Sequence, residues 1–417
     1  MKEVEDPRSP RAKKHDLAEV LTYLTAGYIT GHTSLRRCLK WCRRQKRWFQ
    51  KHGLKLKNGI ASLPTVSRLL SGIDELLFLF VFIEWISGIV QTKGAHLAVD
   101  GKAIRAAAER CKGKRAPMML HVMDAATGLV LAQMPIPDKE SEITNIPQLL
   151  SYLDIRDSTI TADALNTQTR VMEQIIGQGG HFVMMVKKNH PVSYEEIIEA
   201  FREMKEERKR IERDPGYHAK YPQFMSRYDE VAYTEKNRDR YEYRNYSIIN
   251  NASFLSKTEK EWPFLRSIGC AEQIRILLVR DETGKDITPS KEQFLRDGSS
   301  RQPAPRKGDE ESADIQIVGI ISDKEMTAEE MGRCKRSHRS VENRLHHVLD
   351  DTFREDRSPA RNSRNNLALI RKFALNVLRL VQIQTGDQSP ISEMMDFLND
   401  NKDLLGRYIF EPIVSLY

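Results

Sequence analysis

Residues 95–105 read AHLAVDGKAIR, and the interpretation of the rest of the chain starts from this stretch. Its apolar residues predict a short buried strand that ends at Asp100, after which Gly101 breaks the strand before two cations, Lys102 and Arg105. Ligands of open α/β sheets bind at the carboxyl ends of strands, and an Asp beside cations suits a divalent ion held against a phosphate. A strand followed by a solvated turn explains the same residues, so Asp100 alone does not decide.

Composition sets the class of protein. The chain has 417 residues, of which 40% are hydrophobic and 30% are charged, and this length and balance predict two or three globular domains. Lys and Arg number 66 against 58 Asp and Glu, which gives a formal net charge of +8. A basic excess favours polyanionic partners, with nucleic acid first among them.

Several classes are disfavoured by the sequence. The longest apolar run, Leu76–Ile83, ends at Glu84, whereas a membrane span needs about 20 such residues. Five cysteines without a CxxC pair support neither a disulfide framework nor a zinc site. Residues 1–14 are charged and lack the apolar core of a signal peptide. We therefore expect no membrane segment and a cytoplasmic, nucleoid-associated location.

The first 92 residues are predicted to form a helical domain. Within it, Leu35–Lys51 interleaves basic residues with Trp41, Trp48 and Phe49. A helix of this kind lies well along a DNA backbone, with Arg36, Arg43 and Arg47 as candidate phosphate contacts. A surface helix with inward aromatics and solvated cations explains the pattern equally well.

From residue 93 to residue 190 the periodicity becomes that of an α/β sheet. The predicted order is strand 95–100, strand 117–123, strand 128–134, helix 144–153, strand 158–163, helix 168–176 and strand 181–186. The first three strands pair as a meander, and crossover helices make the fourth and fifth parallel to their neighbours. The first and fourth strands then lie side by side, so that Asp100 and Asp163 meet. Two buried carboxylates repel each other unless a cation lies between them.

The second half of the chain is predicted to be β-rich and then helical. Residues 191–322 begin with a long helix, continue as strands, and include a mobile loop at 281–314. Residues 323–386 follow with a helix whose apolar face includes Val341 and Leu345, and residues 387–417 form a helical tail. On an adjoining stripe of that helix lies Glu342 with Lys335 and Arg339. Spacing alone does not select Glu342 over the other acids, which are Asp350, Asp351, Glu355 and Asp356.

Several motifs occur together in a fixed order. They are GIASLPTVSR at 59–68, AVDGK at 98–102, DKESEI at 138–143, TADALNTQ at 161–168, VENRLH at 341–346 and LDDTFRED at 349–356. In this combination the chain resembles the DDE transposases of bacterial insertion sequences, in the ISAs-one branch of the IS-four-like superfamily, which includes the H-repeat-associated proteins. The chain departs from the family pattern at Arg339, where Trp is usual, and at Ser340, where Gly is usual.

The resemblance implies a fold, a site and partners. The fold is α/β: an RNase H-like mixed five-stranded sheet with flanking helices, a helical N-terminal domain and a β-rich insertion. The implied catalytic and metal-binding residues are Asp100, Asp163 and Glu342. The resemblance thus selects Glu342 over the other acids of the last segment. The implied cofactor is a pair of Mg²⁺ ions, for which Mn²⁺ can substitute. The implied partners are double-stranded DNA, as terminal inverted repeats and target, and a second copy of the chain. Further candidate DNA contacts are Lys102, Arg105, Lys187, Lys335 and Arg339.

The expected chemistry is displacement at phosphorus. Two metal ions flanking a scissile phosphate would activate a water for in-line attack and stabilise the leaving 3′ oxygen. The freed 3′-OH would then attack target DNA at the same site. Two other functions remain open: a metal-dependent nuclease without strand transfer, and a catalytically inactive DNA-binding protein derived from a transposase.

Overall fold

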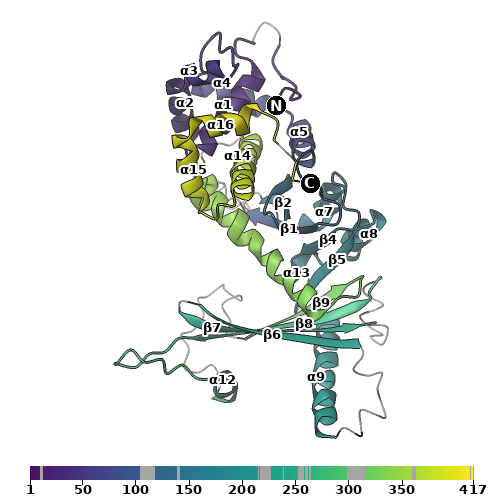
Figure 1. Ribbon diagram of the computed structural model, residues 1–417. Coiled ribbons are helices and arrows are strands. Elements are labelled where there is room, and N and C mark those ends of the chain that lie inside the picture. The colour runs from purple at the N-terminus through teal and green to yellow at the C-terminus, as the bar shows by residue number, and fades with distance from the viewer. Residues whose placement is uncertain are drawn as a thin grey trace. The chain divides into compact units, whose positions relative to one another are not determined.

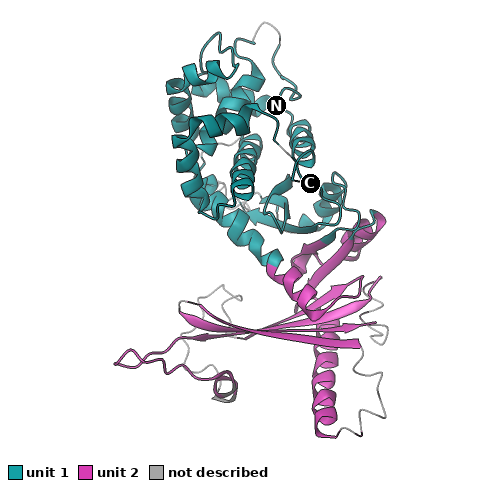
Figure 2. Ribbon diagram, in the orientation of Figure 1, with its two compact units in different colours: residues 1–159, 178–180, 337–417 teal, residues 160–177, 181–336 magenta. Residues whose placement is uncertain are grey.

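The computed structural model describes residues 1–9, 13–103, 118–138, 141–214, 216, 227–237, 239–251, 258, 262, 264–297, 315–358, 363–413 and 415–416. Arg105, one of the predicted DNA contacts, lies outside the described residues. The chain divides into two compact units (Figure 2). Unit 1 consists of residues 1–159, 178–180 and 337–417, and unit 2 of residues 160–177 and 181–336.

The N-terminal part of unit 1 is helical, as predicted. Its helices are α1 (Leu17–Ile29), α2 (Leu35–Arg44), α3 (Lys46–Lys51), α4 (Leu63–Gly72) and α5 (Glu75–Ser87). Polar side chains cap four of them: Asp16, Ser34, Ser62 and Asp74 each accept a hydrogen bond from a backbone N–H in the first turn. The basic and aromatic stretch is two helices rather than one, because the first ends at Gln45.

The strands follow in the predicted order. They are β1 (His96–Ala103), β2 (Met118–Asp124), β3 (Val130–Ile136), β4 (Thr159–Ala162) and β5 (His181–Val186), with helices α7 (Glu142–Leu150) and α8 (Thr169–Gly177) between the later ones. One detail of the prediction is wrong, since β1 does not stop at Gly101. Gly101 and Lys102 still pair with Leu120 and Met119 of β2. The glycine instead leaves room for a close neighbour, because a Cβ there would overlap the carboxylate of Glu142, which would have to move.

Among the described residues the sheet has nine strands, so the predicted five-stranded sheet is wrong in strand number, although the mixed α/β class is confirmed. The remaining strands are β6 (Tyr228–Lys236), β7 (Arg240–Asn250), β8 (Ser267–Leu277) and β9 (Ile315–Ser322). The strand order is β3-β2-β1-β4-β5-β9-β8-β7-β6. β9 pairs antiparallel with β5 through Val183 and Ser322, and β8, β7 and β6 follow as antiparallel neighbours. The predicted insertion thus covers the backbone groups that β5 would otherwise leave unpaired at a sheet edge.

Helices cover both faces of the strands of unit 2. α9 (Pro191–Arg213) packs on β8 and β9 (Figure 1). A Cβ on Gly319 of β9 would lie 3.5 Å from Cδ1 of its Ile197. Successive residues of a strand face opposite sides. Ile320 accordingly packs with Met331 of α13 (Ala328–Val341). Within the predicted mobile loop, α12 (Lys291–Asp297) packs on β8, and residues 298–314 lie outside the described part of the chain.

The core of unit 1 is organised by α14 (Arg364–Thr385). This helix contacts α1, α4, α5 and β3, as well as α15 (Ile391–Asp400), which is followed by α16 (Lys402–Phe410) (Figure 1). It is buried from Asn366 to Val381, a length that includes the charged residues Arg371, Lys372 and Arg379. Charged side chains at such positions require partners in the same interior.

α13 continues into two π-helical segments, η5 (Glu342–His346) and η6 (Val348–Thr352), and then into the short 3₁₀ helix η7 (Glu355–Arg357). Val341, Leu345 and Leu349 are buried, as the apolar spacing predicts. Among the described residues, no helix combines the length and the hydropathy that crossing a membrane requires.

Candidate functional site

Asp100 lies within β1 of unit 1, and its side chain is 22% exposed. The backbone N–H of Gly101 donates to its Oδ1 at 2.9 Å, which fixes one carboxylate oxygen. Its Oδ2 lies 3.6 Å from Nδ1 of His346. Burial, followed by the nearby Lys102 and Lys372, lowers the pKa of His346 to about 3, so this imidazole is neutral at pH 7. The contact between the two side chains is therefore not an ion pair.

Asp163 lies in unit 2 and caps the short 3₁₀ helix η2 (Ala164–Asn166), directly after β4. The backbone N–H of Ala164 donates to its Oδ1 at 2.7 Å. Lys187 follows β5, and its Nζ lies 3.6 Å from the same oxygen. The turn is tied to β5 because Thr167 donates from its hydroxyl to the carbonyl of Met185 at 2.6 Å. The turn that carries Asp163 is thus attached to β5, the strand that precedes Lys187.

Glu342 is exposed at the start of η5 in unit 1. Two residues on, Arg344 anchors this segment to the turn between β2 and β3. Its guanidinium donates to the carbonyls of Ala125 at 2.8 Å, of Ala126 at 3.1 Å and of Thr127 at 2.7 Å. The carbonyl of Arg344 accepts in turn from Arg379 of α14. The segment that carries Glu342 is therefore attached to the β2–β3 turn and to α14.

The same segment is attached to β1 by a cluster of buried charges. Lys102 is 5% exposed, and its Nζ lies 2.5 Å from Asp350, 3.4 Å from Asp356 and 3.5 Å from Glu355. The other oxygen of Glu355 lies 2.9 Å from Nζ of Lys372 and 3.7 Å from Nη1 of Arg371. We refer to Lys102, Asp350, Glu355, Asp356, Arg371 and Lys372 as the buried charge cluster.

The electrostatics of the cluster keep its central carboxylate ionised. Burial by itself raises the pKa of Glu355, but the charges of Lys372, Lys102 and Arg371 outweigh this effect and lower the pKa to about 2. Burial lowers the pKa of Lys372 to about 8, which still leaves this ammonium charged at pH 7. For Lys102, the three carboxylates outweigh burial and raise the pKa. Glu355, Lys372 and Lys102 are therefore charged at neutral pH.

The predicted DNA contacts occupy different positions. Arg36, Arg43 and Arg47 are exposed on α2 and α3, while Trp41 and Phe49 of the same stretch are buried against each other. This agrees with inward-facing aromatics, and it leaves the cations at the surface. Lys335 is half-buried and Arg339 exposed on α13, whereas the ammonium of Lys102 is engaged by three carboxylates.

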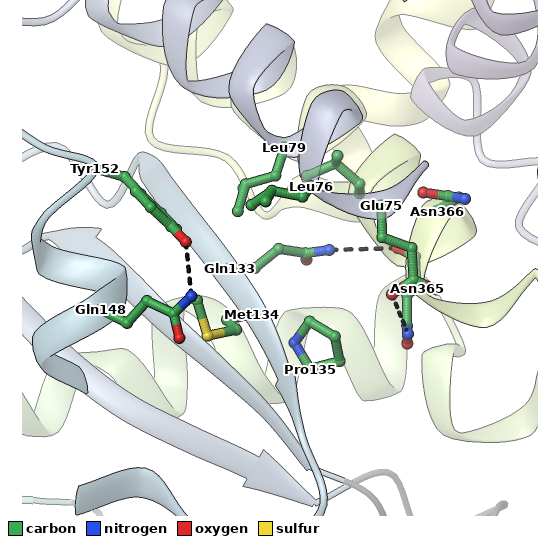
Figure 3. A pocket seen from close by; sticks show the side chains of 11 residues that line it. Glu75, Leu76, Leu79, Gln133, Met134, Pro135, Gln148, Tyr152, Asn365 and Asn366 are labelled. Atoms are coloured by element: carbon green, nitrogen blue, oxygen red, sulfur yellow. Dashed lines mark hydrogen bonds between the residues drawn. The ribbon is translucent and has the colours of Figure 1, made fainter. Parts of the chain in front are cut away.

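A cavity of about 220 Å³ lies elsewhere in unit 1, among α5, β3, α7 and α14 (Figure 3). Gln133 donates to the backbone carbonyl of Asn365 at 3.3 Å, and Gln148 donates to the hydroxyl of Tyr152 at 2.9 Å. Both hydrogen bonds are drawn as dashed lines in Figure 3. Neither Asp100 nor Glu342 lines it. This cavity is therefore separate from the residues that the sequence marks as functional.

The three predicted carboxylates are divided between the units, with Asp100 and Glu342 in unit 1 and Asp163 in unit 2. In the part of the chain that the structure describes, no group of three or more His, Cys, Asp or Glu side chains is arranged to hold a metal ion.

Sequence reasoning missed the residues that hold this segment in place. Arg344, Lys372 and Arg379 were not singled out, and Glu355 entered only as a rival acid to Glu342. A signal was present in α14, where Arg371 and Lys372 interrupt the apolar run LALI-RK-FAL. Charged residues inside a helix that is apolar on all sides indicate buried charges with partners elsewhere in the chain.

Comparison with family models gives two matches. Residues 1–86 match the DDE_Tnp_1-associated domain, and residues 91–377 match the Transposase DDE domain. The second match spans Asp100, Asp163 and Glu342, together with the residues of the buried charge cluster.

Curated relatives agree with these matches. A protein of Escherichia coli O157:H7 named "Putative transposase YncI" is 28% identical over 382 residues, which cover 90% of this chain and 85% of that protein. The "H repeat-associated putative transposase YhhI" of Escherichia coli strain K12 is 25% identical over 378 residues, covering 90% and 88%. Among solved structures, the piggyBac transposase synaptic complex with hairpin DNA aligns over 97% of this chain and 76% of that chain. Its TM-score of 0.36 and identity of 11% are too low to support an argument.

Proposed function

Because the chain belongs to the Transposase DDE domain family and is of the H-repeat-associated type, we propose that it cleaves DNA at the ends of an insertion sequence and joins the freed strand to target DNA. The observation that carries this proposal is the family match over residues 91–377, which contains all three acidic motifs in order. The proposal assigns DNA binding to residues 1–92, an RNase H-like catalytic core to residues 93–190 and 323–386, the β-rich insertion to 191–322 and the helical tail to 387–417.

We assign the catalytic role to Asp100, Asp163 and Glu342. Asp100 is in β1 and Asp163 directly follows β4, and each stands in one of the acidic motifs that the family match spans, which supports their assignment. Glu342 is exposed on a segment whose π-helical turns are of a kind often found at functional sites. Three of its four rivals are accounted for differently, since Asp350, Glu355 and Asp356 are paired with Lys102.

The donor set fits Mg²⁺. This ion prefers oxygen ligands, and carboxylates supply them. One oxygen of Asp100 and one of Asp163 is fixed by a backbone N–H, so that each carboxylate is orientated before any ion binds. Two bound Mg²⁺ ions, or Mn²⁺ in their place, would supply an activated water and stabilise the leaving 3′ oxygen.

The chain's own cations would hold the DNA. Lys187 stands beside Asp163, so its ammonium is positioned for a phosphate near that carboxylate. We propose that Lys335 and Arg339 contact phosphates near Glu342, and that Arg36, Arg43 and Arg47 hold the DNA backbone further away. Arg105 keeps the role that the sequence predicts. Lys102 was predicted to bind phosphate as well, but its carboxylate partners lead us to a different role for it below.

The proposed partners are terminal inverted repeats and target DNA, with two copies of the chain in the complex that holds both ends. A nuclease without strand transfer would use the same carboxylates for the first step alone. The distinguishing experiment incubates the full chain with Mg²⁺, a labelled fragment of the DNA flanking its gene, and a supercoiled target plasmid.

Labelled DNA joined covalently to the plasmid is the expected result. Discrete Mg²⁺-dependent cleavage without joined product at any time would indicate the nuclease instead. Binding without cleavage would indicate a DNA-binding protein derived from a transposase.

A further inference from the structure

We propose that Glu355 is a positioning residue, whose buried carboxylate joins Lys102 of β1 to Lys372 of α14 and thereby fixes Asp100 and Glu342 relative to each other. The inference rests on the proposed function and deepens it, since it concerns the same site. All of these residues lie in unit 1.

Lys102 connects β1 to the segment that carries Glu342. Lys102 is two residues after Asp100 on β1, and its neighbour on that strand, Gly101, is held in register with β2. Glu355, with Asp350 and Asp356, follows Glu342 on the segment from η5 to η7. The ammonium of Lys102 contacts all three carboxylates. The strand that carries one proposed metal ligand is therefore tied directly to the segment that carries another.

The contact between Glu355 and Lys372 is buried. Glu355 is 3% exposed and Lys372 is not exposed at all, so their contact at 2.9 Å is shielded from water. Arg371 adds a contact to the same oxygen, and its guanidinium lies 5.5 Å from the ring centroid of Tyr28 on α1. An arrangement that separates one partner of such a cluster leaves an uncompensated buried charge, which is strongly unfavourable. The side chains of the buried charge cluster therefore have few alternative arrangements.

The charged pairs of the buried charge cluster fix the position of the segment that carries Glu342. A buried ion pair is weak evidence for stability, because apolar residues of the same size often stabilise equally well. Charged pairs do fix geometry, since several carboxylate oxygens converge on one ammonium. The segment already has an anchor at its start, where Arg344 binds the β2–β3 turn. Glu355 anchors its end, and Glu342 and His346 lie on the anchored segment.

The test measures metal binding as well as activity. The full chain is mixed with the labelled DNA end, and Mn²⁺ binding is followed by the electron paramagnetic resonance signal of the free ion. Glu342→Gln on the same DNA gives the background from DNA and surface sites. The variants are Lys102→Met and the double variant Glu355→Gln with Lys372→Met, which removes both members of the buried pair together.

The matched control is Asn376→Ala. Asn376 is fully buried one turn further along α14, but its side-chain hydrogen bonds go to the backbone of Val130 on β3 and to no member of the buried charge cluster. Asn376→Ala is expected to lower the melting temperature, but it leaves the contacts of Lys102 with Asp350, Glu355 and Asp356 in place. Melting curves of all variants show which of them fold, and Lys102→Met carries the test alone if the double variant does not.

If Glu355 is a positioning residue, the Mn²⁺ concentration at half-saturation should rise about 10- to 100-fold in both variants. This is the usual effect of losing a group that orientates metal ligands. Cleavage should fall with it, while affinity for the DNA end stays within about twofold. Combining Lys102→Met with the double variant should add little, because Lys102→Met already removes the contact between Lys102 and Glu355. Asn376→Ala should bind Mn²⁺ as the unmodified chain does.

Unchanged Mn²⁺ binding in folded Lys102→Met and in the folded double variant would overturn the inference. An equal loss in Asn376→Ala would overturn it as well, since general destabilisation would then explain the effect. If the unmodified chain binds no more Mn²⁺ than Glu342→Gln, the proposed function fails and the inference fails with it.

Discussion

Lys102 and Asp350 form a contact of 2.5 Å in which the lysine is almost wholly buried. The lysine belongs to the first acidic motif and the aspartate to the last, so the pair joins two motifs that lie at distant positions in the sequence. A solvated turn after β1, one of the two interpretations of the opening stretch, does not describe this lysine. The basic residue after Asp100 instead anchors the segment that carries Glu342.

Gly101 should not tolerate even one added methyl group. A Cβ at this position would overlap the buried carboxylate of Glu142 and press on Met118. Gly101→Ala is therefore expected to destabilise unit 1 by about 1–3 kcal/mol, the usual cost of overpacking. Urea denaturation measures the change. Gly177→Ala is the control, because a Cβ there meets open space. Equal stability of the two variants would contradict the close packing of Glu142 over β1.

Arg344 should matter more than an exposed arginine on the same helical stretch. Arg344→Met leaves three carbonyls of the β2–β3 turn without the guanidinium. The expected loss in the free energy of unfolding is about 1.5–3 kcal/mol, as for hydrogen bonds to a charged group. Arg333→Met, at an exposed position of α13, is expected to change stability by less than about 0.5 kcal/mol. Comparable losses in the two variants, measured by urea denaturation, would refute the anchor.

Glu355 should make stability depend on pH in the acid range. Its pKa of about 2 lies below its ordinary value of 4.5, so its contribution is complete above about pH 4.5 and is lost as the pH falls towards 2. The shift corresponds to about 3 kcal/mol. The difference in unfolding free energy between the unmodified chain and Glu355→Gln should therefore shrink across this window. A difference that stays constant from pH 6 to pH 2.5 would show that Glu355 is not held ionised by its partners.

The exposed cations of α2 and α3 should contribute to DNA affinity through counterion release. Each phosphate contact contributes about 0.9 to the slope of log K against log salt. The triple variant should lower that slope by as much as about 3, and its substitutions are Arg36→Gln, Arg43→Gln and Arg47→Gln.

The control removes the same charge from three cations of α9, each of which is paired with a glutamate. Its substitutions are Arg202→Gln, Lys209→Gln and Arg210→Gln. Equal changes of slope in the two triple variants would show that only net charge matters.

The local pattern of the sequence predicted the order of β1 to β5, because runs such as HFVMMV at 181–186 are short, apolar and bounded by turn residues. The pairing of β9 with β5 was not predictable in this way. It joins Val183 to Ser322 across a long insertion, and nothing in either run specifies the partner. A nine-stranded sheet therefore replaced the expected five-stranded one.

In the candidate site, too, local motifs were readable from the sequence, whereas contacts between distant segments were not. Motif spacing and resemblance selected Asp100, Asp163 and Glu342 as a proposal. The buried charge cluster was hidden because Glu355 and Lys372 look like solvated residues when read singly. Only their contact at 2.9 Å, between two different elements, shows that they are paired in the interior.

The most direct test of the central claim is cleavage of the DNA end by the unmodified chain and by Glu342→Gln, each with and without Mg²⁺. The account predicts nicking at one discrete position by the unmodified chain in the presence of Mg²⁺. It predicts no nicking by the variant, and equal DNA affinity for both proteins. Asp100→Asn and Asp163→Asn should behave as Glu342→Gln does. Full metal-dependent nicking by all three variants would contradict the assignment of these carboxylates and with it the proposed mechanism.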